Sequence, residues 1–93
     1  MYMVVRTWAN AGALADAMLQ QQEDVAKIIG SVPGFVSYYA TRSGDTLSTV
    51  TICESQAGVQ ESTKRAGEWV KSNLVGTSIE APQIAEGETF LRF

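Results

Sequence analysis

Residues 53–74 read CESQAGVQESTKRAGEWVKSNL, and this stretch decides the fold. It follows an alternating, β-rich run from Leu47 to Cys53. Ser55 can accept hydrogen bonds from the free N–H groups of a starting helix. At about 100° per residue, the apolar side chains beyond it fall on one stripe, formed by Val59, Ala66 and Val70. The stretch therefore predicts a strand, a capped start and an amphipathic helix.

A polar and aromatic margin runs beside this apolar stripe. Ser62, Trp69 and Asn73 occupy the margin at spacings of i, i+7 and i+11. A helix with an aromatic ring and two hydrogen-bonding groups along one edge of its apolar face can line a pocket. The same pattern suits a packed helix with a solvated edge, and the sequence leaves both interpretations open.

A β-hairpin is predicted before this helix. Pro33-Gly34 turns the chain into a β-rich segment from Phe35 to Arg42, and Ser43-Gly44 is a two-residue turn signal. This turn predicts three facing pairs: Arg42 with Asp45, Tyr38 with Thr49, and Val36 with Thr51. Side-chain alternation then gives two faces. One face carries Val36, Tyr38, Leu47, Thr49, Thr51 and Cys53, and the other carries Phe35, Tyr39, Val50 and Ile52.

Both faces of this hairpin carry large apolar side chains, so both should be covered. The chain has only two predicted helices, which are enough for one face. We therefore predict a homodimer through the sheet face that no helix covers, with an interface that includes Phe35, Tyr39, Val50 and Ile52.

The two ends of the chain complete the predicted sheet. Tyr2–Trp8 predicts a first strand, and Asn10 is a candidate N-cap for one long helix whose apolar stripe runs from Leu14 to Ile29. Residues 83–93 predict a last strand. The order β-α-β-β-α-β is that of a ferredoxin-like α+β fold, with a four-stranded antiparallel sheet and two helices on one face.

The composition limits the classes of function. The length suits a single domain over residues 1–93, with a net charge of −3 and no basic cluster beyond Lys64-Arg65. This balance argues against nucleic acid as a partner. One cysteine excludes an intrachain disulfide and fits a cytoplasmic location, and no apolar run approaches about 18 residues, so no membrane span is expected. The basic side chains, Arg6 among them, are expected at the surface, solvated or paired.

The sequence contains no histidine. This absence removes the commonest general base near neutral pH and the commonest metal ligand. A single cysteine cannot supply a zinc site, so no metal site is predicted. A Ser-His-Asp or Cys-His catalytic unit is excluded, and so is haem held by an axial histidine.

The β-α-β-β-α-β order, Pro33-Gly34-Phe35 at the second strand and the Cys53-Glu54-Ser55 junction together resemble the dimeric α/β-barrel superfamily. Within it, the chain is similar to the antibiotic-biosynthesis-monooxygenase group over essentially its whole length. The resemblance implies two sheets packed face to face in a homodimer. It also implies a small cofactor-free oxygenase that acts on an aromatic or enolic molecule. Where the oxygenases of this group have Trp before the junction and Asn in the strand, this chain has Cys53 and Thr49.

Three anomalies favour a ligand pocket between the helices and the sheet. Gln21 lies inside an apolar stripe, Tyr and Thr side chains face the helices, and the polar and aromatic margin accompanies them. If these polar side chains surround a solvated or ligand-filled cavity, their polar atoms are not buried without hydrogen-bond partners. The predicted pocket consists of Trp69, Ser62, Asn73, Gln21, Tyr38, Thr49 and Cys53, and Tyr38 is a candidate to hold an anionic substrate oxygen. The alternative is a non-catalytic dimer that binds a small ligand or has a structural role.

Overall fold

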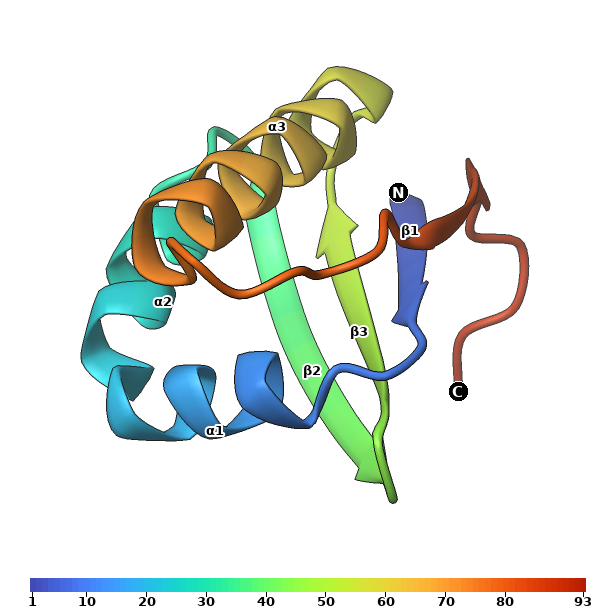
Figure 1. Ribbon diagram of the computed structural model, residues 1–93. Coiled ribbons are helices and arrows are strands. Elements are labelled where there is room, and N and C mark those ends of the chain that lie inside the picture. Colours follow the sequence, from blue (N-terminus) through green and yellow to red (C-terminus); the bar gives the residue numbers. More distant parts are fainter.

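A computed structural model describes residues 1–93, and it confirms the α+β, ferredoxin-like class. Four strands form one antiparallel sheet in the order β2-β3-β1-β4. Figure 1 shows the helices together on one side of this sheet. The elements are β1 (Tyr2–Trp8), α1 (Gly12–Gln20), α2 (Gln22–Gly30), β2 (Phe35–Ser43), β3 (Thr46–Cys53), α3 (Gln56–Asn73) and β4 (Gln83–Glu88).

The first predicted helix is two helices, so the expectation of one continuous helix was wrong. The chain leaves the helical conformation at Gln21, which has φ −121° and ψ 40°. Glu23 and Asp24 lie in the first turn of α2, where acidic side chains favour a helix start. Asn10 is not the N-cap, because Ala11 takes that position while Asn10 adopts a left-handed φ of 51°.

The hairpin turn lies one residue later than predicted. Gly44 and Asp45 form the loop, because Ser43 pairs with Thr46. Gly44 has a φ of 59°, as the first loop residue of a type II′ hairpin requires. The three predicted pairs are therefore wrong, and the observed ones are Arg42 with Leu47, Ala40 with Thr49, and Tyr38 with Thr51. Moving the turn by one residue shifts the β3 partner of each β2 residue by two positions. Tyr38 and Thr49 therefore still share a face.

A β-bulge at the start of β2 reverses two predicted side-chain directions. Phe35 pairs with Cys53 and Ser37 pairs with Ile52, so Val36 is an extra residue. Phe35 packs against the buried core, whereas Val36 is 39% exposed. The assignment of Phe35 to the uncovered face and of Val36 to the helix-covered face was therefore wrong.

The last strand is shorter than predicted. β4 ends at Glu88 because its pairing with β1 ends where β1 begins, at Tyr2. The N–H of Thr89 still donates to the carbonyl oxygen of Met1 at 2.9 Å. Beyond it, the large side chains of the last residues are exposed, namely Phe90, Leu91 and Phe93.

The core has two apolar clusters separated by a polar layer. One cluster contains Trp8, Ala11, Leu14, Leu47 and Trp69, and the other contains Val4, Val32, Cys53 and Val59. Each of β1, β3 and α3 contributes to both clusters and has buried polar residues between its two contributions. These residues, which we call the polar layer, are Arg6, Thr49, Thr51 and Ser62.

Candidate functional site

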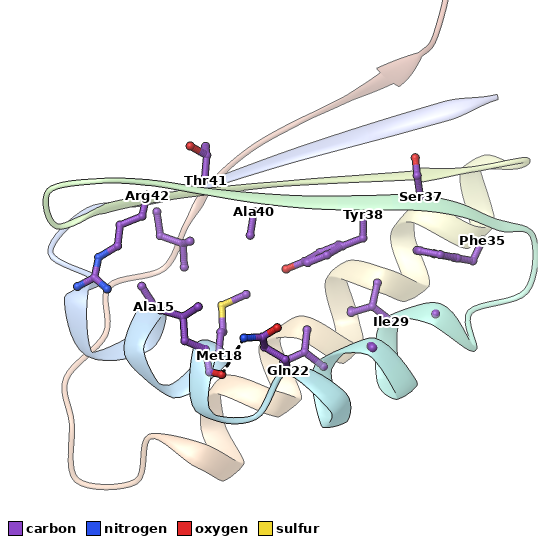
Figure 2. A pocket seen from close by; sticks show the side chains of 15 residues that line it. Ala15, Met18, Gln22, Ile29, Phe35, Ser37, Tyr38, Ala40, Thr41 and Arg42 are labelled. Atoms are coloured by element: carbon purple, nitrogen blue, oxygen red, sulfur yellow. Dashed lines mark hydrogen bonds between the residues drawn. The ribbon is translucent and has the colours of Figure 1, made fainter.

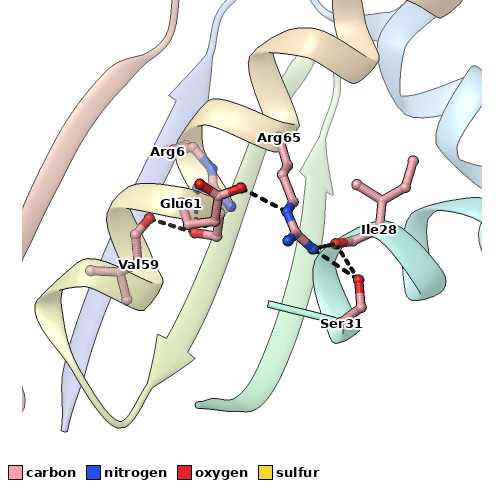
Figure 3. A network of polar contacts seen from close by, with 7 residues as sticks. Arg6, Ile28, Ser31, Val59, Glu61 and Arg65 are labelled. Carbon is pink, nitrogen blue, oxygen red and sulfur yellow. Dashed lines mark hydrogen bonds and ion pairs between the residues drawn. The ribbon is translucent and has the colours of Figure 1, made fainter. Parts of the chain in front are cut away.

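The centre of the polar layer is a buried guanidinium group. Arg6 on β1 is 1% exposed, so its expected place at the surface was wrong. Figure 3 shows its side chain reaching beneath α3. It donates four hydrogen bonds to hydroxyl groups: Nε to Thr49 Oγ1 at 3.3 Å, Nη2 to Thr51 Oγ1 at 2.6 Å, and Nη1 to Ser62 Oγ at 3.1 Å and Thr63 Oγ1 at 2.9 Å.

Arg6 has no carboxylate partner. The ion pairs of the structure are Arg42 with Asp16 and Arg65 with Glu61. Burial lowers the pKa of the Arg6 guanidinium, and the neighbouring Tyr38 and Cys53 raise it. A cation held in the interior only by neutral hydroxyls is costly, because those groups replace only part of its hydration. Groups whose pKa is shifted by burial cluster at functional sites, which makes Arg6 a candidate functional residue.

Arg65 has a different role from Arg6. Figure 3 shows it reaching from α3 to the end of α2. Its Nη1 donates to the carbonyl oxygen of Ile28 and to Ser31 Oγ, both at 2.8 Å, while Nε bonds Glu61 at 2.9 Å. These contacts satisfy one carbonyl group at the C-terminus of α2 and fix α2 against α3.

A cavity of about 600 Å³ lies between α1, α2 and β2. Alanines leave much of this space, because Ala15, Ala26 and Ala40 stand on its three walls. Figure 2 shows the Tyr38 side chain on the helix side of β2, with its hydroxyl directed into the cavity. Larger apolar side chains complete the lining, among them Met18, Leu19, Val25, Ile29, Phe35 and Leu47.

The cavity has one charged lining residue, at one end. Arg42 lines it there and donates from Nη1 to Asp16 Oδ1 at 2.8 Å. Both side chains of this pair are exposed to solvent, to 40% for Arg42 and 62% for Asp16, so water screens their charges. The buried charge of Arg6 lies instead on the far side of Tyr38, across β3.

A second cavity of about 30 Å³ lies deeper in the molecule. It shares Met18, Val25 and Tyr38 with the large cavity, and its other walls are apolar or aromatic: Trp8, Leu14, Ala66, Trp69 and Val70. Tyr38 therefore stands between the two spaces. Burial raises the pKa of the Tyr38 hydroxyl, and the charge of Arg6 and the hydroxyl of Thr49 lower it. The phenol is neutral at neutral pH and can donate a hydrogen bond.

Solved structures share this architecture. The monooxygenase from the gene ActVA-Orf6 of Streptomyces coelicolor, in complex with Nanaomycin D, aligns with a TM-score of 0.72 and 17% identity over 99% of this chain and 89% of that one. SnoaB, a cofactor-independent oxygenase from Streptomyces nogalater, aligns at 0.68 and 12% identity over 98% and 94%. The fold is that of the antibiotic biosynthesis monooxygenases. No protein-family model matches the sequence, and no curated protein matches it.

The same monooxygenase fold also occurs with porphyrin bound. A variant of MhuD with two manganese protoporphyrin IX molecules per active site aligns at a TM-score of 0.71 and 13% identity, over 100% of this chain and 98% of that one. At these identities the likeness establishes the fold, and the activity has to be argued from the site.

In the structure, the predicted pocket residues separate into three groups. Tyr38 lines both cavities, and Trp69 lines the small one. Thr49 and Ser62 bind Arg6 in the polar layer. The remaining three line neither cavity: Gln21 is at the break between α1 and α2, Cys53 is in an apolar cluster, and Asn73 donates from Nδ2 to the Trp69 carbonyl oxygen at 2.9 Å.

Sequence reasoning missed Arg6 and most of the walls of the large cavity. Side chains alternate along a strand, so Arg6 faces the same side as Val4 and Trp8, two positions before and after it. Because both of these apolar side chains face the core, the pattern predicts a buried Arg6. The alanine walls left no comparable signal. The structure brings together no group of three or more His, Cys, Asp or Glu side chains suited to a metal ion. None of its helices has the length and apolar character needed to cross a membrane.

Proposed function

We propose that the protein is a cofactor-free oxygenase whose substrate, a small aromatic or enolic molecule, binds in the large cavity. The observation that carries the proposal is the cavity itself, which is mainly apolar and has the Tyr38 hydroxyl directed into it. Its volume of about 600 Å³ lies in the range of ligand pockets. The likeness in fold to a cofactor-independent oxygenase and to a monooxygenase in complex with Nanaomycin D adds support.

The reaction balances without an added reductant. For a phenol with a free para position, phenol and O₂ give a para-quinone and water. A ring C–H bond is replaced by a C=O bond, one oxygen atom of O₂ enters the new carbonyl group, and the other leaves as water. The substrate supplies all four electrons. Tyr38 donates a hydrogen bond to the substrate oxygen and stabilises the anion that reacts with O₂.

Oxygen uptake tests this proposal. An oxygen electrode records consumption with a panel of naphthols, and Trp fluorescence records binding of the same compounds. Tyr38→Phe should bind them and lose most of the uptake, because the ring is kept and the hydroxyl is lost. Tyr39→Phe is the matched control, since Tyr39 is 64% exposed and next in the strand. Ala40→Phe should abolish binding by filling the cavity.

The two functions in competition give different results in this experiment. Binding with substrate-dependent oxygen uptake supports the oxygenase. Binding that Ala40→Phe abolishes, without uptake for any compound, identifies a non-catalytic ligand-binding protein. If no naphthol binds, neither function of the cavity stands.

We also propose a homodimer through the sheet face opposite the helices. Tyr39 pairs with Val50 and Ser37 with Ile52, and these positions alternate with the buried residues of β3. Apolar side chains on an uncovered sheet face are suited to a second copy of the same face. Light scattering should give twice the chain mass of 10.0 kDa. Ile52→Lys should give the single-chain mass, whereas Gln60→Lys, at an exposed position of α3 on the other side of the sheet, should not.

A further inference from the structure

Arg6 has more hydrogen-bonding capacity than its neighbours use. A guanidinium group has five N–H donors, and Arg6 makes four hydrogen bonds, all to neutral hydroxyls. One N–H of Nη2 has no acceptor, because Nη2 bonds only Thr51. The group is 1% exposed, so bulk water does not compensate its charge. The positive potential therefore extends into the surrounding side chains.

Thr49 connects this charge to the wall of the large cavity. Its Oγ1 accepts from Arg6 Nε at 3.3 Å, which leaves its own proton free to be donated elsewhere. Thr49 pairs with Ala40, and Tyr38 is two residues away on the same face of β2. In Figure 2 the Tyr38 hydroxyl extends along the strand towards Ala40, whose partner in β3 is Thr49. A side-chain hydrogen bond with Thr49 lowers the pKa of the Tyr38 hydroxyl. The Thr49 hydroxyl can accept a hydrogen bond from Arg6 and donate one to the Tyr38 oxygen. The Tyr38 hydroxyl can then donate a hydrogen bond to a ligand in the cavity.

We propose that Arg6 is a positioning residue that acts through Thr49 and Tyr38, so that the large cavity binds its ligand as an oxyanion, a phenolate or enolate, on the Tyr38 hydroxyl. The inference rests on the proposed function, because it needs the ligand to be in this cavity. A hydroxyl that accepts a bond from a cation becomes a better donor. Two such hydroxyls in sequence carry the polarisation from the buried charge to the ligand without direct contact between them.

The other charged or titratable groups near Arg6 and the cavity are paired, exposed to solvent or neutral. Arg42 also lines the cavity, but it is paired with Asp16 and exposed to solvent. Cys53 is a titratable group that interacts with Arg6 from β3, and burial raises its thiol pKa. On α3, Glu61 is paired with Arg65, and on α2 Asp24 accepts a hydrogen bond from Trp69. On β4, Ile84 pairs with Arg6 in the sheet and adds no charge, and the nearby Glu86, opposite Val4, is exposed.

The test uses 4-nitrophenol, whose anion absorbs at longer wavelength than its neutral form, and 4-nitroanisole, which has a similar shape and no ionisable oxygen. With the wild-type protein, the anion should bind about tenfold or more tightly than the neutral phenol, as expected for a charge-assisted hydrogen bond. The pKa of bound 4-nitrophenol should therefore fall by about one unit. The anisole should bind like the neutral phenol. Equal affinities for the anion, the phenol and the anisole would overturn the inference and the stabilising role given to Tyr38, while binding of all three would leave the cavity standing as the ligand site.

Variants assign the effect to Arg6. Arg6→Met should remove the preference for the anion while 4-nitroanisole still binds, and Arg6→Lys should restore part of it. Thr49→Val should reduce the preference, since its shape is kept and its hydroxyl is lost. Arg42→Met is the matched control and should keep most of the preference. A preference that survives Arg6→Met would contradict the inference, and its loss in Arg42→Met would assign the effect to Arg42 instead. If no probe binds to the wild type, the cavity proposal as a whole is contradicted.

Discussion

Trp69 Nε1 donates a hydrogen bond to Asp24 Oδ2 at 2.8 Å, so the indole ring that walls the small cavity is fixed by a carboxylate at the start of α2. The bond joins α3 to the helix that also borders the large cavity. Asp24→Ala should lower the free energy of unfolding by about 1 kcal/mol, because the bond is charge-assisted but Asp24 is exposed. Urea denaturation measures the loss. Glu23→Ala, in the same helical turn, should cost less, and equal losses would contradict the prediction.

Two glycines of α3 should respond to alanine in opposite directions. A Cβ at Gly58 would lie 2.8 Å from Cys53 Cβ and 3.0 Å from the Pro33 carbonyl oxygen. Gly58→Ala should therefore destabilise the protein by about 1–3 kcal/mol, as overpacking does. A Cβ at Gly67 would meet nothing within 4 Å, so Gly67→Ala should stabilise the helix by about 1 kcal/mol. Denaturation midpoints of the same sign for both variants would refute this account of α3.

The protein should lose stability in alkali. Burial raises the pKa of the Cys53 thiol above its ordinary value of 9.0 and that of the Tyr38 hydroxyl above 10.0. Both groups therefore keep their protons in the native state at pH values where the unfolded chain releases them. Their contribution is complete below the ordinary values and is lost as the pH rises through the raised ones.

Thermal melts between about pH 7 and about pH 11 measure this effect. The pKa of Arg6 is shifted downwards by burial and acts in the opposite direction. Tyr38→Phe therefore isolates the contribution of the Tyr38 hydroxyl to the loss of stability in alkali. The decline of the melting temperature above pH 10.0, the ordinary tyrosine pKa, should be shallower in this variant. A decline of the same steepness in wild type and variant would show that Tyr38 does not contribute to it.

The small cavity should take up an apolar gas. Its lining is apolar and aromatic, with a volume of about 30 Å³, and cavities of this character exclude water and accept xenon. Crystals pressurised with xenon should show an electron-density peak beside Trp8 and Trp69. Ala66→Leu should remove the peak by filling the space. A peak in the large cavity alone would show that the small one is closed to a probe of this size.

The strands were predictable because their signals are local. The β-branched and aromatic residues from Tyr2 to Trp8 gave the bounds of β1. Side-chain alternation in the hairpin kept Tyr38 and Thr49 on one face although the turn was misplaced by one residue. Periodicity could not locate the break at Gln21, since the apolar stripe continues through it. Nor could it locate the bulge at Val36, which depends on how β2 fits against the end of β3.

The site was less predictable than the fold. Trp69 was predicted from its place on the margin of the apolar stripe of α3, and Tyr38 from the face of β2 that it shares with Thr49. Both side chains line a cavity in the structure. The large cavity was not, because it results from the spacing of α1, α2 and β2 around small residues such as Ala40. Arg6 was placed at the surface because arginine is usually found there. The alternation of β1 favoured the interior, and the structure follows that alternation.

The buried charge and the large cavity are built by different parts of the chain. β1, β3 and α3 supply Arg6 and its hydroxyl partners, whereas α1, α2 and β2 supply most of the cavity walls. Tyr38 belongs to the cavity wall and is the lining residue whose pKa the Arg6 charge affects. Substitutions among the walls can thus exchange one ligand for another without disturbing the cation behind them. In evolutionary terms, this division lets a lineage change its ligand while it retains the inherited electrostatics, and it makes the α1–α2 segment the place to diversify in a directed-evolution library.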